Sequence, residues 1–224
     1  MIKYILFDLD GTLLDFSKSE KRIIKKVIKD YANYELSIED LNYFSKINEY
    51  WFNRFNDGYM TRIEYQIKRF DEFKKYLKLE FDIESCNKYY CDNLKIAADL
   101  YDDIDILDYL YNKYDLFVAS NGMLETQKNR LLEAKIYNYF KDYYVSEKIG
   151  YNKPDIKFFE YIFNDLNDYN KENYVIIGDR LSTDIIGGKN AGIKTIYLNR
   201  LDILDTNKIS DYEIKSLDEL KNIL

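Results

Sequence analysis

The chain has 224 residues, with 33 Lys and Arg against 40 Asp and Glu, a net charge of -7 and no histidine. This length can hold one α/β core and a smaller inserted domain. The acidic balance gives no general attraction for nucleic acid or anionic membranes, and the absence of histidine excludes Ser-His-Asp and Cys-His catalysis and His-ligated zinc or iron.

The first predicted element is a buried strand at residues 2–7, a short apolar run of β-favouring residues. Asp8 and Asp10 follow it directly, together with Gly11 and Thr12. Charge at the end of a buried strand needs compensation, so this pattern indicates a cation and an anion bound together. Ligands of open α/β sheets bind outside the carboxyl ends of the strands, where both carboxylates would lie. Oxygen ligands favour a hard cation, with Mg²⁺ as the natural candidate.

Residues 16–99 read as successive helices without a convincing strand. Ser37 can cap a helix that begins at Ile38, with Asp40 in its first turn, and Thr61 can cap the next helix in a capping box with Glu64 three residues on. The simplest architecture is a helical cap domain over 16–99, inserted into a core domain that comprises residues 1–15 and 100–224.

Beyond this block, short apolar runs alternate with helical patterns. Strands are expected at 116–119, 143–145, 174–177, 195–198 and 212–214. Helices are expected at 103–113, 124–134, 155–163, 183–190 and from 217 onwards. This alternation predicts an α/β fold with a Rossmann-like, doubly wound, mainly parallel sheet and an inserted all-helical cap domain.

Four short motifs lie at the ends of these strands or the starts of these helices. They are Asp8-Leu9-Asp10-Gly11-Thr12, Ser120-Asn121-Gly122, Lys153-Pro154, and Gly178-Asp179 with Asp184. Singly, each has an ordinary structural explanation, such as a turn or a solvated surface charge. In this order and spacing they resemble the haloacid dehalogenase (HAD) superfamily of phosphohydrolases, which implies a Mg²⁺-dependent phosphomonoester hydrolase.

The resemblance implies a role for each motif residue. Asp8 would be the nucleophile that forms an aspartyl-phosphate, and Asp10 the general acid and base. Ser120 and the amide of Asn121 would hold phosphate oxygens, and Lys153 would balance the charges of Asp8 and the phosphate. An acid at position 10 argues for phosphate esters rather than haloacids or phosphonates.

The resemblance also implies a Mg²⁺ site. Its ligands would be Asp8, the backbone carbonyl of Asp10, and Asp179. Asp184 would orient a metal-bound water or the lysine.

A second resemblance concerns the cap. Its pattern is similar to that of bacterial nucleotidases acting on canonical and noncanonical pyrimidine nucleoside monophosphates, and it consists of Asn48, Trp51, Arg54, Phe55, Gly58, Met60, Thr61 and Arg69-Phe70. This implies a pyrimidine 5'-nucleotidase, although Trp51 and Phe55, four residues apart, are equally explained by packing inside the cap. The alternatives are a phosphoglycolate-type or sugar-phosphate phosphatase, a β-phosphoglucomutase-like phosphosugar mutase, and a non-enzymatic binding protein on the same fold.

We expect a soluble cytoplasmic protein, because the N-terminal apolar run is too short for a signal peptide and no stretch approaches a membrane span. The expected partner is a small phosphorylated metabolite, most specifically a nucleoside monophosphate, with no nucleic acid and no membrane. Monomer and dimer both stay open.

Overall fold

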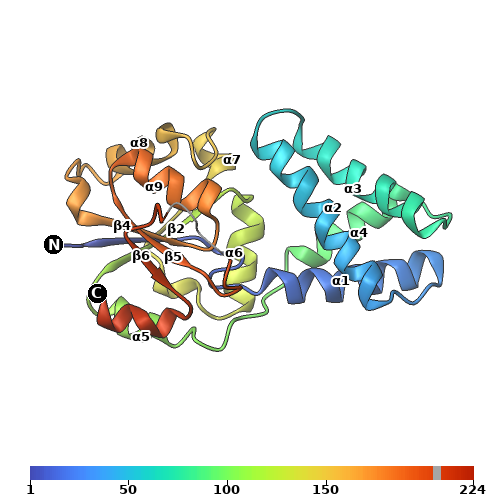
Figure 1. The fold of residues 1–224 in the computed structure, drawn as a ribbon, viewed down its shortest axis with the longest axis horizontal. Coiled ribbons are helices and arrows are strands. Elements are labelled where there is room, and N and C mark those ends of the chain that lie inside the picture. The colour runs from blue at the N-terminus through green and yellow to red at the C-terminus, as the bar shows by residue number, and fades with distance from the viewer. Residues whose placement is uncertain (204–207) are drawn as a thin grey trace. The chain divides into compact units, whose positions relative to one another are not determined.

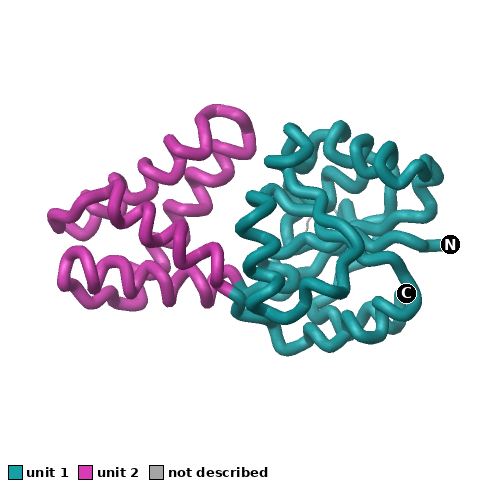
Figure 2. The backbone as a smooth tube through the Cα atoms, turned by 180° about the vertical axis from the view of Figure 1, so that it is seen from behind, with its two compact units in different colours: residues 1–15, 98–224 teal, residues 16–97 magenta. Residues whose placement is uncertain are grey.

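The computed structural model describes residues 1–203 and 208–224. The chain forms two compact units, one made of residues 1–15 and 98–224 and the other of residues 16–97 (Figure 2). We call them the α/β unit and the helical unit. The predicted fold class, an α/β sheet structure with an inserted helical region, is confirmed. The function of the helical unit as a cap over the site stays a prediction.

The α/β unit contains one six-stranded sheet in which all neighbouring strands are parallel, in the order β3-β2-β1-β4-β5-β6. The strands are β1 (Tyr4–Phe7), β2 (Asp115–Ser120), β3 (Asp142–Val145), β4 (Tyr174–Gly178), β5 (Lys194–Leu198) and β6 (Tyr212–Ile214). The order reverses at β1, so a ligand crevice is expected at the carboxyl ends of β2, β1 and β4.

Helices cover both faces of the sheet, which makes it doubly wound (Figure 1), and an apolar cluster lies on each face. The α-helices of this unit are α5 (Ile106–Tyr111), α6 (Leu124–Glu133), α7 (Ser146–Ile149), α8 (Ile156–Asp165) and α9 (Ile186–Ala191). Side chains of α5 and α6 belong to the cluster on one face of the sheet, and side chains of α8 and α9 to the cluster on the other. The strand β1 supplies Ile5 and Phe7 to the first cluster and Leu6 to the second, as alternating side chains of a central strand must.

Shorter helical turns complete this unit. They are the 3₁₀ turns η1 (Tyr137–Tyr139), η2 (Lys171–Asn173) and η4 (Leu217–Asn222), and the π-helical turn η3 (Leu181–Ile185). Three expectations need correction. The helix predicted over 103–113 begins only at Ile106, the closing helix is a 3₁₀ helix, and the helix predicted over 183–190 follows the π-helical turn.

The helical unit contains α1 (Phe16–Ala32), α2 (Ile38–Asn56), α3 (Arg62–Leu77) and α4 (Ile83–Leu94). Ser37 and Thr61 cap α2 and α3 as predicted, and each forms a reciprocal capping box with the acid three residues on, which was expected only for Thr61. Phe44, Phe70 and Phe73 lie in a buried core shared by the helices. Among the described residues, no helix of either unit is long and apolar enough to cross a membrane.

The two segments that lead into and out of the helical unit lie side by side within the α/β unit. The Asp15 backbone N–H donates to the Asp99 carbonyl at 2.8 Å, and Leu14 and Leu100 form an antiparallel bridge. The chain therefore leaves the α/β unit and returns to it at neighbouring positions.

Candidate active site

A buried lysine lies at the carboxyl end of the central strand. Lys153 belongs to the loop before α8 and is 1% exposed, and its Nζ lies 2.8 Å from Oδ1 of Asp8, which follows β1 directly. The same Nζ donates to Asp184 Oδ1 at 2.5 Å and to the Ala119 carbonyl at 2.5 Å. An ammonium group has three donors, so Lys153 is fully hydrogen-bonded and its position is determined by three separate segments of the chain.

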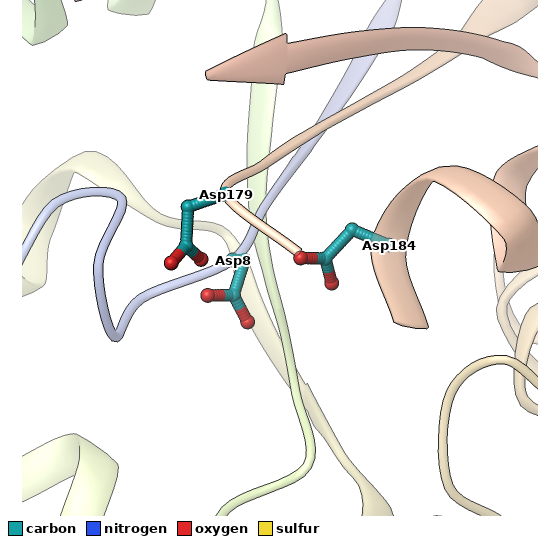
Figure 3. Close-up of side chains that lie close together, drawn as sticks. All are labelled: Asp8, Asp179 and Asp184. Carbon is teal, nitrogen blue, oxygen red and sulfur yellow. The ribbon is translucent and has the colours of Figure 1, made fainter. Parts of the chain in front are cut away.

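Three carboxylates cluster at this point, and two of them, Asp8 and Asp184, contact the lysine. Asp8, Asp179 and Asp184 each offer an oxygen, and these oxygens lie within 4.8 Å of one another (Figure 3). Burial raises the pKa of Asp8 to about 7. The nearby charge of Lys153 lowers this pKa, and that of Asp184 raises it further. Burial, Asp8 and Asp184 likewise raise the pKa of Asp179 well above its usual value. The cluster therefore holds more negative charge than one lysine balances, and its oxygen-only donor set fits a hard divalent cation such as Mg²⁺.

The first loop shapes the position of Asp179. Gly11 has a φ of +88°, and a Cβ at this residue would lie 2.1 Å from Asp179 Oδ2. The fully buried hydroxyl of Thr12 donates to Asp179 Oδ1 at 3.5 Å. Glycine is therefore required at position 11 both for its backbone conformation and for the close approach of a carboxylate.

The Ser120-Asn121 segment ends β2 beside this cluster. Asn121 donates from Nδ2 to the Lys153 carbonyl at 2.9 Å and accepts at Oδ1 from the Lys153 N–H at 2.8 Å. The side chain of Asn121 is therefore bound to the backbone of Lys153. The phosphate contact predicted for Asn121 would be made by its backbone N–H. Ser120 is 3% exposed, and its hydroxyl accepts from the Gly122 N–H at 3.1 Å. Phosphate binding by Ser120, Asn121 and Lys153 stays a prediction.

Asp10 is close to the cluster in sequence, but its carboxylate is not one of the three clustered groups. Oδ1 of Asp10 lies 2.7 Å from Arg130 Nη1, and Oδ2 accepts from Gln127 Nε2 at 3.1 Å. Its side chain is 35% exposed, which suits a group that exchanges protons with a substrate and with water. Sequence reasoning missed Gln127 and Arg130, although a glutamine and an arginine three residues apart on a helix next to a motif were an available signal.

Asp184 has two engaged oxygens. Besides its bond to Lys153, its Oδ2 accepts from the Arg180 N–H at 3.1 Å, and the residue is fully buried in η3. The bond to Lys153 is the contact that a lysine-orienting role would require, and the roles of Asp184 toward the lysine and toward a metal-bound water both stay predictions.

The residues of the nucleotidase-like pattern have partners inside the helical unit. The Trp51 indole N–H donates to Glu72 at 2.7 Å, and Phe55 stacks on Tyr65 with ring centroids 5.7 Å apart. Asn48 and Arg69 are buried and joined by a 2.9 Å hydrogen bond. Packing therefore accounts for these four residues.

A family model described as haloacid dehalogenase-like hydrolase matches residues 5–198. This chain belongs to that family. It is 33% identical to the HAD-hydrolase YfnB of Bacillus subtilis, and the alignment covers 98% of this chain and 94% of YfnB. A crystal structure of YfnB bound to magnesium superposes with a TM-score of 0.90 at 33% identity, covering 100% of this chain and 98% of the other.

Two further relatives are named by activity. The pyrimidine 5'-nucleotidase PynA of Streptococcus pneumoniae is 31% identical over 99% of this chain and 97% of its own. The glyceraldehyde 3-phosphate phosphatase of Methanocaldococcus jannaschii is 28% identical over 100% of this chain and 97% of its own. The family model and YfnB establish the HAD family for this chain, whereas these two relatives differ from each other in substrate.

Proposed function

We propose that this HAD-family protein is a phosphomonoester hydrolase that works through an aspartyl-phosphate on Asp8. The observation that carries the proposal is the buried contact between Asp8 and Lys153 at the carboxyl end of the central strand. A phosphoryl group approaching Asp8 would bring further negative charge to this point, and the fixed lysine would offset it without rearrangement.

A Mg²⁺ ion is the cofactor that fits this site. Asp8, Asp179 and the backbone carbonyl of Asp10 would hold it, with Asp184 adjacent. When bound, the ion supplies the positive charge that lets an anionic phosphate approach an anionic carboxylate. The excess of buried carboxylates supports this, as does the magnesium in the YfnB crystal structure.

The chain's own residues account for the proton transfers. An Asp8 oxygen attacks phosphorus while the bond from phosphorus to the ester oxygen breaks, and Asp10 as a carboxylic acid gives that oxygen its proton. Asp10, now a carboxylate, then takes a proton from water as the water oxygen attacks the phosphorus of the aspartyl-phosphate. Inorganic phosphate leaves, and both aspartates return to their starting forms.

We further propose that the substrate is a pyrimidine nucleoside 5'-monophosphate. PynA, a pyrimidine 5'-nucleotidase, is similar over nearly the whole of both chains. A sugar-phosphate phosphatase is the second candidate, because the Methanocaldococcus jannaschii phosphatase also aligns over the full chain.

Phosphate release from a panel of monoesters tests both levels of the proposal. The panel comprises UMP, dUMP, dTMP, AMP, phosphoglycolate, glyceraldehyde 3-phosphate and hexose phosphates, each with Mg²⁺ and with EDTA. We expect pyrimidine nucleotides to be preferred and EDTA to abolish turnover. A preference for sugar phosphates would overturn the nucleotidase assignment alone, and no hydrolysis of any ester would overturn the phosphatase.

The variant Asp8→Asn tests the nucleophile, with Asp218→Asn as a matched control because Asp218 is exposed. Only Asp8→Asn should lose turnover, by at least about 10³-fold. Undiminished turnover in Asp8→Asn would contradict the aspartyl-phosphate.

A further inference from the structure

Two buried polar side chains of α6 contact the Asp10 carboxylate. Gln127 is 2% exposed and Arg130 is 1% exposed, although both carry groups that water would solvate well. They lie three residues apart, which places them on the same face of the helix. Arg130 Nη1 is 2.7 Å from Asp10 Oδ1, and Gln127 Nε2 donates to Asp10 Oδ2 at 3.1 Å. Each oxygen of Asp10 therefore has its own partner on α6.

The arginine also determines which way the glutamine amide faces. Arg130 Nη1 donates to Gln127 Oε1 at 3.0 Å. A guanidinium can only donate, so the amide oxygen must face Arg130 and the amide NH₂ must face the other way. That NH₂ group reaches both Asp10 Oδ2 and, at 3.1 Å, the hydroxyl oxygen of Ser120.

The glutamine in turn sets the direction of the Ser120 hydroxyl. Its oxygen accepts from the Gly122 N–H and from Gln127 Nε2, each at 3.1 Å. Both lone pairs of the hydroxyl are then in use, so its hydrogen is left to donate. A serine oriented in this way can donate to a phosphate oxygen and cannot accept from a neighbour instead.

Gly122 provides the space for this arrangement. A Cβ at this position would lie 2.4 Å from Gln127 Nε2 and 2.9 Å from Gln127 Cγ. The glycine of the second motif therefore makes room for the glutamine of α6.

We propose that Gln127 and Arg130 are positioning residues for the reaction. They hold the Asp10 carboxylate toward the ester oxygen, and Gln127 also directs the Ser120 hydroxyl at the phosphate. Gln127 occupies one lone pair of Asp10 Oδ2, and the second lone pair of this oxygen remains for the proton in transit. This inference rests on the proposed function, because it gives Asp10 and Ser120 the roles described there.

A role in anchoring α6 to the first loop would make a different prediction. Loss of an anchor lowers activity on every substrate alike. Loss of positioning at Asp10 lowers activity most where the leaving oxygen needs a proton, and an alkyl alkoxide needs one far more than p-nitrophenolate does. The value of kcat/KM reports the first half-reaction, in which the leaving group departs.

The experiment measures kcat/KM for p-nitrophenyl phosphate and for the best alkyl monophosphate of the panel, in the wild type, Arg130→Met and Gln127→Met. For Arg130→Met we expect a loss of about 10- to 100-fold on the alkyl ester and less than about threefold on p-nitrophenyl phosphate. Gln127→Met should lower both values through Ser120, and the alkyl value by about tenfold more. Lys128→Met removes a positive charge from the same helix, where Lys128 lies over the Tyr143 ring, and should change neither value.

Thermal unfolding shows which variants fold. If Arg130→Met does not fold, the comparison of the two esters in Gln127→Met tests the proposal. Equal losses on the two esters, or no loss, would overturn the positioning role in an enzyme that is still a phosphatase. A wild type that hydrolyses neither ester would overturn both the proposed function and this inference. That result differs from equal losses in the variants, which would overturn the inference alone.

Discussion

At the scale of single residues, the site depends on side chains and glycines whose contacts no other residue type could make. Lys153 uses all three donors, and its acceptors come from the first loop, β2 and η3. Gly11 lies directly against Asp179. Such positions combine a chemical role with a geometric one, so even a conservative change affects both.

Replacing Lys153 by Met should lower kcat/KM for phosphate monoesters by about 10²- to 10³-fold, because the cation that faces the transferring phosphoryl group is lost. Lys157→Met is the matched control, since Lys157 is exposed on the first turn of α8. Steady-state kinetics in Mg²⁺ measure the effect. Activity in Lys153→Met within threefold of the wild type would contradict the role of this lysine.

Replacing Gly11 by Ala should weaken Mg²⁺ binding by about tenfold or more, because the new methyl group displaces the Asp179 carboxylate. Gly150 is a close control, as its φ of +86° nearly equals the +88° of Gly11 but nothing lies within 4 Å of its Cβ position. Gly150→Ala therefore carries the same backbone strain without the clash. Calorimetric titration with Mg²⁺ compares the two, and equal affinities would contradict the predicted clash with Asp179 at position 11.

At the scale of elements, the ion pair between Arg200 and Asp103 and its hydrogen bonds join four separate segments of the α/β unit. Arg200, after β5, donates to both carboxylate oxygens of Asp103 at 2.8 Å, and to the Thr12 carbonyl at 3.0 Å. Asp103 also accepts from the Ser216 hydroxyl and the Leu217 N–H at the start of η4. The side chain of Asp103 is held by this network, and the carbonyls of residues 103–105 accept turn bonds from the N–H groups three residues on, so the regular α5 begins only at Ile106.

The network predicts a pH-dependent contribution to stability. Burial alone would raise the pKa of Asp103, but the hydrogen bonds from Arg200, Leu217 and Ser216 outweigh it and the pKa is lowered. A lowered folded-state pKa stabilises the protein above the ordinary aspartate pKa of about 4, and this stabilisation is lost as pH falls through the folded value. Asp103→Asn should therefore reduce the free energy of unfolding by about 1–3 kcal/mol at pH 7.

Urea unfolding at pH 7 and at acid pH measures this effect, with the exposed neighbour Asp102 as control in the variant Asp102→Asn. The difference between wild type and Asp103→Asn should shrink below about pH 4. A difference that is the same at both pH values would contradict the contribution of the ionised carboxylate.

At the scale of the whole molecule, periodicity and motifs predicted the fold class, and local signals such as the capping boxes predicted helix starts. The central strand and its two aspartates were evident because a short apolar run ends in charge. Contacts between distant segments were not evident, since Gln127 and Asp10 are 117 residues apart and Arg200 and Asp103 are 97 apart. Nothing in local sequence specifies which side chain of α6 meets the first loop, because that depends on how the helix packs against the sheet.

The paired segments at Asp15 and Asp99 make the 82-residue insert a replaceable module. Because its two ends leave from hydrogen-bonded neighbours, another insert with similarly close ends could be joined there without stretching the sheet. A chimera that carries the corresponding segment of the Methanocaldococcus jannaschii phosphatase should keep Mg²⁺-dependent turnover of p-nitrophenyl phosphate and shift its preference from the proposed pyrimidine nucleotides to glyceraldehyde 3-phosphate. An unchanged preference would locate specificity in the α/β unit. Exchange of the insert at this junction would let members of the family differ in substrate while the catalytic residues of the α/β unit stay the same.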